Sequence, residues 1–355
     1  MIFRIPKAVI LNQRVSLGVI LVASACFSLL LFGFSLNKFQ ILAPVFFGDH
    51  NVILDFAKTT TEWAREGYPN TGFLYQKLGL ADSVDSVVIF SFIVCLGVFT
   101  YMLIIAPVVD FTALVILLLF LSFSSVFLQQ YSKDFFVLFI VMSMVMFGLK
   151  TKLGLVIFVA TGLLYAYYFR NYWFLVFANY FGFVISFHLL KIPATRFKVL
   201  LVSCLFILVL SIAFEIVLDV GLSHYRRIIN ISRVGDVNAT SIILPFIPVG
   251  NFFLEWINGL ITLIMMLFPI KLLALGGLQH VASFIAISFI SLNFFRDMED
   301  AMSDHGGKHA VFFVVSFVLV QMTFEPDYSS FLRHLTPLLP LVLVSHYKAC
   351  MLRSQ

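Results

Sequence analysis

Four ionisable side chains lie close together near the end of the chain, within the stretch FEPDYSSFLRHLTP at residues 324–337. They are Glu325, Asp327, Arg333 and His334, and apolar residues precede and follow them. An imidazole or a carboxylate can accept a proton from a hydroxyl group, and a guanidinium group can bind phosphate oxygens. The residue types therefore suit a polar site that binds an anion and activates a hydroxyl group.

A helix start explains part of this stretch. Pro326 suits the first position of a helix, and acidic residues are stabilising in the first turn. Glu325, Ser329 and Arg333 are spaced by four residues and are predicted to share one helical face, either as an ion pair between helices or as a substrate site. Arg333 would lie about 10 Å into the last span. A charge at this depth faces a bundle interior or a water-filled cavity, which favours a substrate site that includes Asp327.

The composition places this stretch in a membrane protein. The 355 residues are 61% hydrophobic and 12% charged, whereas roughly a quarter of the residues of a soluble domain are charged. Apolar runs of about 18 or more residues recur along the chain and predict transmembrane helices. We expect an all-α polytopic membrane protein with a single transmembrane domain over residues 1–355.

Loop charges predict the topology. About ten apolar runs, in a range of 10–12, are read as spans, and the segment 246–271 is predicted to be re-entrant or broken because prolines bound its polar middle. Ten spans place both termini in the cytoplasm, together with most Lys and Arg residues of the connections. The loops 37–85 and 221–245 then face outside, where we expect the function. The predicted spans are 15–36, 86–107, 111–128, 135–150, 153–169, 172–190, 199–220, 272–295, 309–324 and 328–347.

Further cations in the outer segments are candidate phosphate ligands. The arginines of the loop 221–245 are Arg226, Arg227 and Arg233. They bind phosphate, lie in a solvated loop, or pair with Glu215 and Asp219. Arg170 lies in YYFRNYW, whose aromatic residues either form an interfacial belt or stack against sugar rings. Lys133 and Asp134 form either a helix-capping pair or part of a site.

The first outer loop contains Asp49, His50 and Asp55, which could act as a base or as metal ligands, although their spacing matches no known metal signature. No metal or cofactor is expected. The chain contains no glycine-rich nucleotide motif, no HExxH and no Gly-x-Ser-x-Gly, so nucleotide hydrolysis and metalloprotease activity have no support. The net charge of +5 is attributed to topology rather than to nucleic acid, and nearly all of the 43 phenylalanines are expected to face lipid.

Three segments, SKDFFVLF, FRNYWF and FEPDYSSFLRHLTPLLPL, together with the outer-face arginines, resemble the bacterial O-antigen and capsule repeat-unit polymerases of the Wzy type. The resemblance consists of topology and scattered short motifs over most of the chain. The second outer loop is smaller than in many members and the first is larger. The resemblance implies a metal-independent, GT-C-like glycosyltransferase of the bacterial inner membrane whose site faces the periplasm.

The resemblance also implies partners and residue roles. The substrate would be an undecaprenyl-pyrophosphate-linked oligosaccharide in the lipid bilayer, and a chain-length regulator and a flippase would be further partners. His334, Glu325 and Asp327 would be catalytic, with His334 or Glu325 as the base for the acceptor hydroxyl. The substrate-binding residues would be Arg333, Arg170, Arg226, Arg227, Arg233, Lys133 and Tyr328.

Three other functions fit parts of the sequence. Another GT-C transferase would use a polyprenyl-monophosphate sugar and Asp49 or Asp55. An O-antigen ligase would use a lipid acceptor. A lipid-linked sugar flippase would be expected to have paired discontinuous helices, and the sequence predicts only one, at 246–271.

Overall fold

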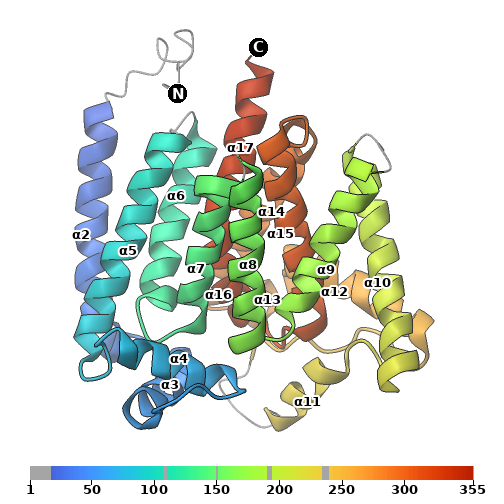
Figure 1. Ribbon diagram of the computed structural model, residues 1–355, viewed down its shortest axis with the longest axis horizontal. Coiled ribbons are helices and arrows are strands. Elements are labelled where there is room, and N and C mark those ends of the chain that lie inside the picture. Colours follow the sequence, from blue (N-terminus) through green and yellow to red (C-terminus); the bar gives the residue numbers. More distant parts are fainter. Residues whose placement is uncertain (1–16, 107–109, 149–150, 190–193, 234–239, 355) are drawn as a thin grey trace. The chain divides into compact units, whose positions relative to one another are not determined.

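The structure is a computed structural model of a chain that is helical along most of its described length (Figure 1). The described part contains no β-strand, only an isolated bridge between Ile242 and Asp327. Two compact units are present, residues 1–136 with 350–355, and residues 137–349. The described residues are 17–106, 110–148, 151–189, 194–233 and 240–354.

Six helical segments of the described chain are long and apolar enough to cross a membrane, which confirms the all-α, membrane-embedded class. Three shorter apolar helices accompany them, α8 (Lys152–Tyr168), α9 (Trp173–Val184) and α12 (Phe252–Leu267). The predicted number of about ten spans stays a prediction. The six are Val84–Ile105 (α5), Phe111–Leu128 (α6, Phe111–Phe123, with the π-helical turn η2, Ser124–Leu128), Arg196–Leu218 (α10), Leu278–Ala301 (α14), His305–Phe324 (α15) and Tyr328–Arg353 (α16, Tyr328–Leu335, then η5, Thr336–Leu338, and α17, Leu339–Arg353).

The first unit packs α2 (Leu17–Ile41) against α5 and α6. The predicted outer loop 37–85 is largely helical, because η1 (Pro44–Phe47), α3 (Gly48–Thr59) and α4 (Gly67–Lys77) form within it. α3 and α4 lie side by side (Figure 1). α3 buries His50, Ile53 and Ala57 on one side while Asp55 stays exposed, so α3 is amphipathic. α4 buries most of its residues from Pro69 to Tyr75.

A buried lysine fixes the end of α2. The ammonium group of Lys38 is completely buried and donates to the backbone carbonyl oxygens of Ser125 at 2.9 Å and Gln129 at 2.6 Å. These carbonyls lie in and just after the π-helical turn that ends α6, where the helix leaves acceptors without intrahelical partners. Lys38 therefore caps another helix.

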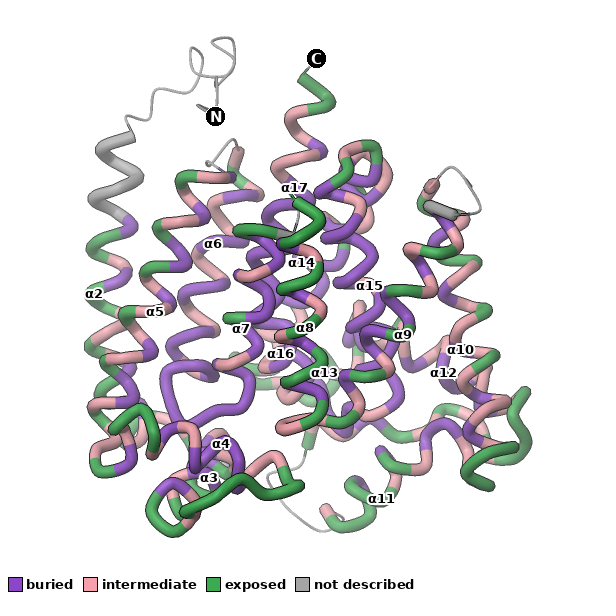
Figure 2. The backbone as a smooth tube through the Cα atoms, in the orientation of Figure 1, coloured by how far each residue is buried: buried purple, intermediate pink, exposed green. Residues whose placement is uncertain are grey.

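The second unit is built around α15. α7 (Lys133–Ser143) begins in the first unit and continues into the second from residue 137. The other helices of the second unit are η3 (Met144–Gly148), α8 (Lys152–Tyr168), α9 (Trp173–Val184) with η4 (Ile185–Leu189), α10, α11 (His224–Ser232), α12 (Phe252–Leu267), α13 (Ile270–Leu275), α14, α16 and α17. Almost every residue of α15 is buried, as the colouring in Figure 2 indicates, and α9, α10, α11, α12 and α14 pack against it. A helix that is apolar on all sides is expected at such a central position.

Aromatic rings fill the space between α8, α9 and α15. Phe158, Trp173, Phe177, Tyr180 and Phe313 are almost completely buried and contact one another through their rings. The expectation that nearly all phenylalanines face lipid is therefore wrong for this cluster. Trp173 is also buried, so it does not belong to a surface belt.

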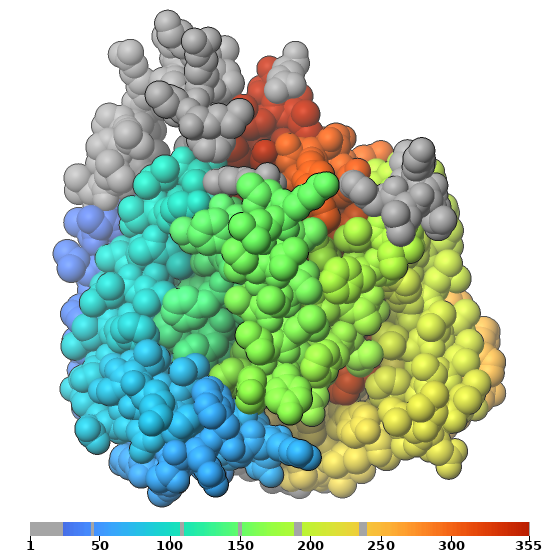
Figure 3. All heavy atoms as spheres, viewed as in Figure 1, coloured from blue at the N-terminus to red at the C-terminus, as the bar shows by residue number. Residues whose placement is uncertain are grey.

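The outer sides of the helices carry the apolar residues that suit contact with lipid. On α8 the side chains of Leu153, Val156 and Leu164 are 70%, 62% and 58% exposed. α8 forms part of the surface that is drawn in green in Figure 3. Exposed apolar side chains of this kind on an apolar helix are typical of a membrane protein.

The segment 246–271 contains a helix and a break. α12 begins after Asn251 and ends at Leu267, and α13 follows Pro269. Asn258, in the polar middle of this segment, binds the backbone that precedes α12. Its amide oxygen accepts hydrogen bonds from the N–H groups of Phe246 and Ile247. Whether the segment crosses or re-enters the membrane stays a prediction.

Replacement of Gly72 by alanine tests the packing of α3 against α4. A Cβ atom at Gly72 would lie 2.6 Å from the backbone nitrogen of Ala57, so we expect a loss of about 1–3 kcal/mol. The control is Gly97→Ala in α5, where nothing lies within 4 Å. Thermal unfolding in detergent and proteolysis of the 60–66 connection measure the effect, and equal behaviour of the two variants would contradict the described packing.

Candidate functional site

The EPD turn connects the central helix to the last span. α15 ends at Phe324, Glu325 is extended, and α16 begins at Tyr328 after the N-cap Asp327. Pro326 thus precedes the cap and is not the first helical residue. Glu325 lies outside α16, so the predicted helical face shared by Glu325, Ser329 and Arg333 is wrong.

The neighbouring segment 241–243 holds the turn in place. The carbonyl oxygen of Pro326 accepts a hydrogen bond from Ile243 N–H at 2.8 Å, and Tyr328 N–H donates to Ser241 at 3.3 Å. The carboxylate of Asp327 accepts from the backbone N–H of Ser330 at 2.8 Å. Backbone and cap together fix the direction in which α16 leaves the turn.

His334 is the centre of the site. Its side chain and that of Glu325 are only 8% and 3% exposed, and 2.5 Å separates His334 Nδ1 from the Glu325 carboxylate. Gln321 Oε1 lies 3.3 Å from the same nitrogen. On the other side of the ring, Arg170 lies 2.6 Å and Arg333 3.4 Å from Nε2.

These partners assign the tautomer of His334. A guanidinium group only donates hydrogen bonds, so Nε2 beside Arg170 must be the acceptor. Nδ1 then carries the hydrogen and donates it to the carboxylate of Glu325. The imidazole is therefore neutral, oriented by a carboxylate, and presents its basic nitrogen to two cations.

Arg170 reaches this ring from the turn between α8 and α9. Its backbone N–H donates to Tyr165 and its carbonyl accepts from Trp173 N–H, which closes the turn. The guanidinium NH1 also donates to the hydroxyl of Tyr172 at 2.6 Å, and Tyr172 stacks on Phe324 with ring centroids 5.4 Å apart. The FRNYW segment and the end of α15 therefore form one site.

Two members of the site were not predicted from the sequence. Gln321 is 1% exposed and lies near both His334 and the hydroxyl of Tyr172. The available signal was its spacing, because an amide four residues before Glu325 faces the same side of α15. Tyr172 is one of the aromatic residues expected to form an interfacial belt or to stack against sugar rings, and no sequence pattern indicates its contact with Arg170.

The arginines of α11 occupy different environments. Arg226 is 1% exposed and donates to the carbonyl oxygen of Met322 at 2.8 Å. Burial lowers its pKa to about 10, although the carboxylate of Glu255 favours the charged form. This carboxylate is not one of the two predicted partners, Glu215 and Asp219. Arg226 therefore stays charged at neutral pH and holds α11 against α15.

The other two arginines of this group remain closer to the surface. Arg233 donates to Asp327 at 2.6 Å, and the two side chains are 38% and 12% exposed. Arg227 is half-buried. Because Asp327 caps α16 and pairs with Arg233, its carboxylate is already used for structure. Tyr328 follows this cap and is 1% exposed.

Lys133 belongs to the first unit. Its ammonium group lies 3.2 Å from the ring centroid of Tyr68, a cation–π contact, and the side chain is almost buried. Asp134 next to it is also buried. Arg170, Arg333, His334 and Glu325 thus lie together, whereas Lys133 contacts the ring of Tyr68.

The acidic residues of α3 do not combine with His50 into a metal site. Asp49 accepts a hydrogen bond from the Tyr68 hydroxyl at 2.7 Å, and Asp55 is exposed. His50 is 3% exposed, and its Nδ1 accepts from Tyr131 N–H at 3.2 Å. Within the described chain, no group of three potential metal ligands includes any of these three residues.

Comparisons of the chain with protein-family models, with curated proteins and with solved structures found no match. The chemistry of the site in the second unit therefore carries the functional argument. That site combines a neutral, carboxylate-bound imidazole with two guanidinium groups, close to the end of an apolar helix.

Substitutions at Asp327 separate capping from acid–base chemistry. Asparagine is a good N-cap, so Asp327→Asn should cost less than about 1 kcal/mol through the lost pair with Arg233. Asp327→Ala removes the cap as well and should cost about 1–2 kcal/mol. Thermal unfolding in detergent measures both variants. Equal losses of stability would contradict a capping role.

The burial of His50 predicts that the stability of the first unit depends on pH. Burial, followed by the nearby charge of Lys38, lowers the pKa of His50 to about 4. The unfolded chain binds this proton near the ordinary pKa of about 6.5, so the folded state is favoured fully above pH 6.5. Stability should fall as the pH drops from about 6.5 to about 4, by on the order of 3 kcal/mol in total.

The matched variant is His50→Asn, whose amide oxygen can accept from Tyr131 N–H but does not titrate. Its unfolding free energy in detergent should vary less with pH over this range. The same acid slope in both proteins would show that another group is responsible.

Proposed function

We propose that this chain is a membrane glycosyltransferase that joins lipid-linked oligosaccharide repeat units, as the Wzy-type polymerases do. The donor would be a glycan on undecaprenyl pyrophosphate. The observation that supports this most strongly is the set of contacts around His334. Its imidazole, the proposed base, contacts the carboxylate of Glu325 on one side and two guanidinium groups, which can bind phosphate, on the other.

Glu325 prepares His334 for proton transfer. A carboxylate on Nδ1–H fixes the ring orientation and stabilises the imidazolium ion that forms when Nε2 takes a proton. Both side chains are nearly inaccessible to water, which strengthens their electrostatic interaction. His334 is therefore the base for the acceptor hydroxyl and Glu325 its positioning residue.

Arg170 and Arg333 would bind the pyrophosphate. With Glu325 as the carboxylate of the group, the four side chains carry one more positive than negative charge, which suits an anionic ligand. A phosphate oxygen is a stronger partner for a guanidinium group than a neutral imidazole nitrogen. Substrate binding would thus draw Arg170 away from Nε2 and uncover the base.

The transfer would then proceed as follows. The acceptor hydroxyl oxygen forms a bond to the anomeric carbon of the donor glycan while its proton moves to Nε2 of His334. The bond between the anomeric carbon and the pyrophosphate oxygen breaks, and undecaprenyl pyrophosphate leaves with the bonding electrons. The two arginines stabilise the negative charge that develops on the leaving group.

The remaining predicted residues would act around this centre. Arg226 and Asp327 hold α11 and α16 in position through Met322 and Arg233. Arg227 and Arg233 remain candidates for contacts with the glycan, whereas Tyr328 and Lys133 are buried.

We further propose a GT-C-like arrangement of about ten spans, with both termini in the cytoplasm and the site facing the periplasm. The six long apolar helices, together with α2, α7, α8 and α9, supply ten segments for these spans without α12. The lysine and arginine residues of the connections supply the charge bias. A chain-length regulator and a flippase would be its partners in the inner membrane.

The test is the surface glycan of a strain that lacks this chain. A ladder of polymer lengths should collapse to a single repeat unit, and the wild-type chain should restore it. Arg170→Ala, Arg333→Ala and His334→Ala should not restore it, since loss of acid–base catalysis alone costs about 10²–10⁴ in rate. Immunoblotting of the tagged proteins checks that expression is equal.

Arg196→Ala is the matched control, because this arginine forms an exposed pair with Glu299, with side chains 51% and 45% exposed. It should restore the full ladder. An intact ladder in the deletion strain would end the polymerase proposal. Polymer that accumulates on its lipid carrier would instead indicate a ligase, and repeat units that stay on the inner face would indicate a flippase.

A further inference from the structure

Helix α11 has the opposite polarity from a helix that covers a protein in water. Its two buried side chains are polar, because Arg226 and Asn230 are 1% and 3% exposed. Apolar side chains are exposed instead, and the exposed turns of α11 are drawn in green in Figure 2. They are Tyr225 (43%), Ile228 (51%), Ile229 (39%) and Ile231 (71%). A helix between protein and water would bury isoleucine and expose arginine.

Hydrogen bonds fix this orientation of α11 about its axis. Arg226 donates to the carbonyl oxygen of Met322 at 2.8 Å. The side-chain amide of Asn230 donates to the carbonyl oxygen of Ile243 at 2.9 Å. Rotation of the helix that buried the isoleucines would take both donors away from these acceptors, which is costly for buried polar groups. The apolar side of α11 therefore stays on the outside.

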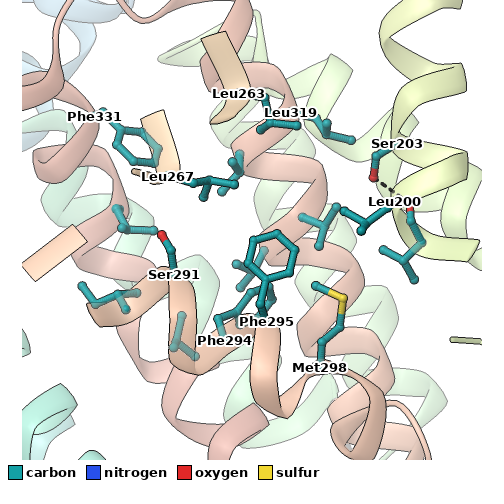
Figure 4. Close-up of a pocket in the computed structure, with 17 residues that line it drawn as sticks. Leu200, Ser203, Leu263, Leu267, Ser291, Phe294, Phe295, Met298, Leu319 and Phe331 are labelled. Carbon is teal, nitrogen blue, oxygen red and sulfur yellow. Dashed lines mark hydrogen bonds between the residues drawn. The ribbon is translucent and has the colours of Figure 1, made fainter. Parts of the chain in front are cut away.

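The preceding helix, α10, indicates what surrounds this side. The inner side of α10 meets α12, α14 and α15 around a small apolar pocket, to which Leu200 and Ser203 contribute (Figure 4). The Ser203 hydroxyl donates within its own helix, to the carbonyl oxygen of Val199, as the dashed line shows. The outer side is apolar as well, with Val209 60% and Ile216 77% exposed. A long helix that is apolar on all sides and still exposed is typical of a membrane span.

Two ring contacts place α11 at the level where two such helices end. Tyr225 contacts Phe214 of α10, with ring centroids 6.2 Å apart, and Phe324 of α15 at 6.0 Å. Phe214 lies one turn before Leu218, the last residue of α10, and Phe324 is the last residue of α15. With 23 residues, α10 is about 35 Å long, slightly more than the hydrocarbon core of about 30 Å. Its ends therefore match the boundary between hydrocarbon and head groups.

The turn between the two helices changes the direction of the chain. Asp219 ends α10 in the left-handed conformation, with a φ angle of 53°, as is common at helix C-terminal caps. The N–H groups of Asp219 and Val220 both donate to the carbonyl oxygen of Phe214. α11 then leaves at an angle to α10 (Figure 1). A helix that leaves the end of a span in this way can lie along the membrane surface.

We infer that α11 binds the surface of the bilayer, with its apolar side among the acyl chains directly below the phospholipid head groups. Helices that lie in a membrane interface bury an apolar side at this depth, and the exposed residues of α11 carry no charge. The apolar side of α11 continues the exposed side of α10, where Val217 is 75% exposed. Phospholipid is therefore the partner that fits it. The inference does not depend on the proposed glycosyl transfer.

The same helix holds the turn of the polar site. Arg226 binds the last turn of α15, and Arg233, which follows α11, donates to Asp327 in the EPD turn. Asn230 binds the segment 241–243, which pairs with the backbone of the same turn. One short helix thus connects the bilayer surface to the polar site.

Photo-crosslinking of the full-length chain in nanodiscs of phosphatidylethanolamine and phosphatidylglycerol tests this inference. In separate proteins, benzoylphenylalanine replaces Ile228 on α11, Val209 on α10 or Asp55 on α3, which is charged and exposed. Mass spectrometry should find phospholipid attached at residues 228 and 209 to a similar extent, and little or none at residue 55. Crosslinks from residue 228 to protein alone, or no lipid at residue 228 while residue 209 is labelled, would overturn the inference.

Two substitutions of Ile228 provide a matched pair in the same nanodiscs. About half of this side chain is exposed, and isoleucine and aspartate have similar helix propensities. Hydrogen exchange of the α11 amides should be about tenfold faster in Ile228→Asp, the factor for roughly two methylene groups that leave hydrocarbon. Ile228→Leu keeps the number of carbon atoms and should leave exchange unchanged. Equal exchange in both variants would show that α11 faces water. If Ile228→Asp does not fold, the crosslinking decides the matter.

Discussion

The contact between Glu325 and His334 constrains everything around it. Both side chains are buried, and a buried carboxylate without a hydrogen-bond donor would be costly. To bring the two together, α15 must end at Phe324 and α16 must begin only after a capped turn. The segment 241–243 and the Arg170 turn then pack against that junction. The geometry of the base is thus set by where two helices end and begin.

The buried cations Lys38 and Arg226 donate to main-chain carbonyl oxygens, so they satisfy acceptors that helix ends leave open. Such contacts are difficult to replace by a ligand and are structural. Arg170 is half-buried, and an imidazole and a phenol are among its partners. A phosphate is a stronger partner than either of these two groups, so a ligand can replace these two contacts.

The sequence predicts the class of the protein well, because apolar runs and sparse charge are local properties that depend little on tertiary contacts. It also identifies His334, Glu325, Arg333 and Arg170 as candidates, since ionisable groups are conspicuous in such a chain. It does not predict that Arg226 is buried or that Asp327 is a cap. Those outcomes depend on where α11 packs and where α16 begins. The prediction that the phenylalanines face lipid fails for the same reason, because the type of an apolar residue does not indicate whether lipid or another ring covers it.

The burial of Lys38 has a consequence for the order in which the chain is assembled. Its acceptors follow it by 87 to 91 residues, which a ribosome takes several seconds or more to add. Until then the ammonium group of Lys38 needs water or lipid head groups as partners, because a buried charge without hydrogen-bond acceptors is costly. The end of α2 can therefore take up its final packing only after α6 has been synthesised. The packing of the first unit is completed late, even though its helices are synthesised one after another.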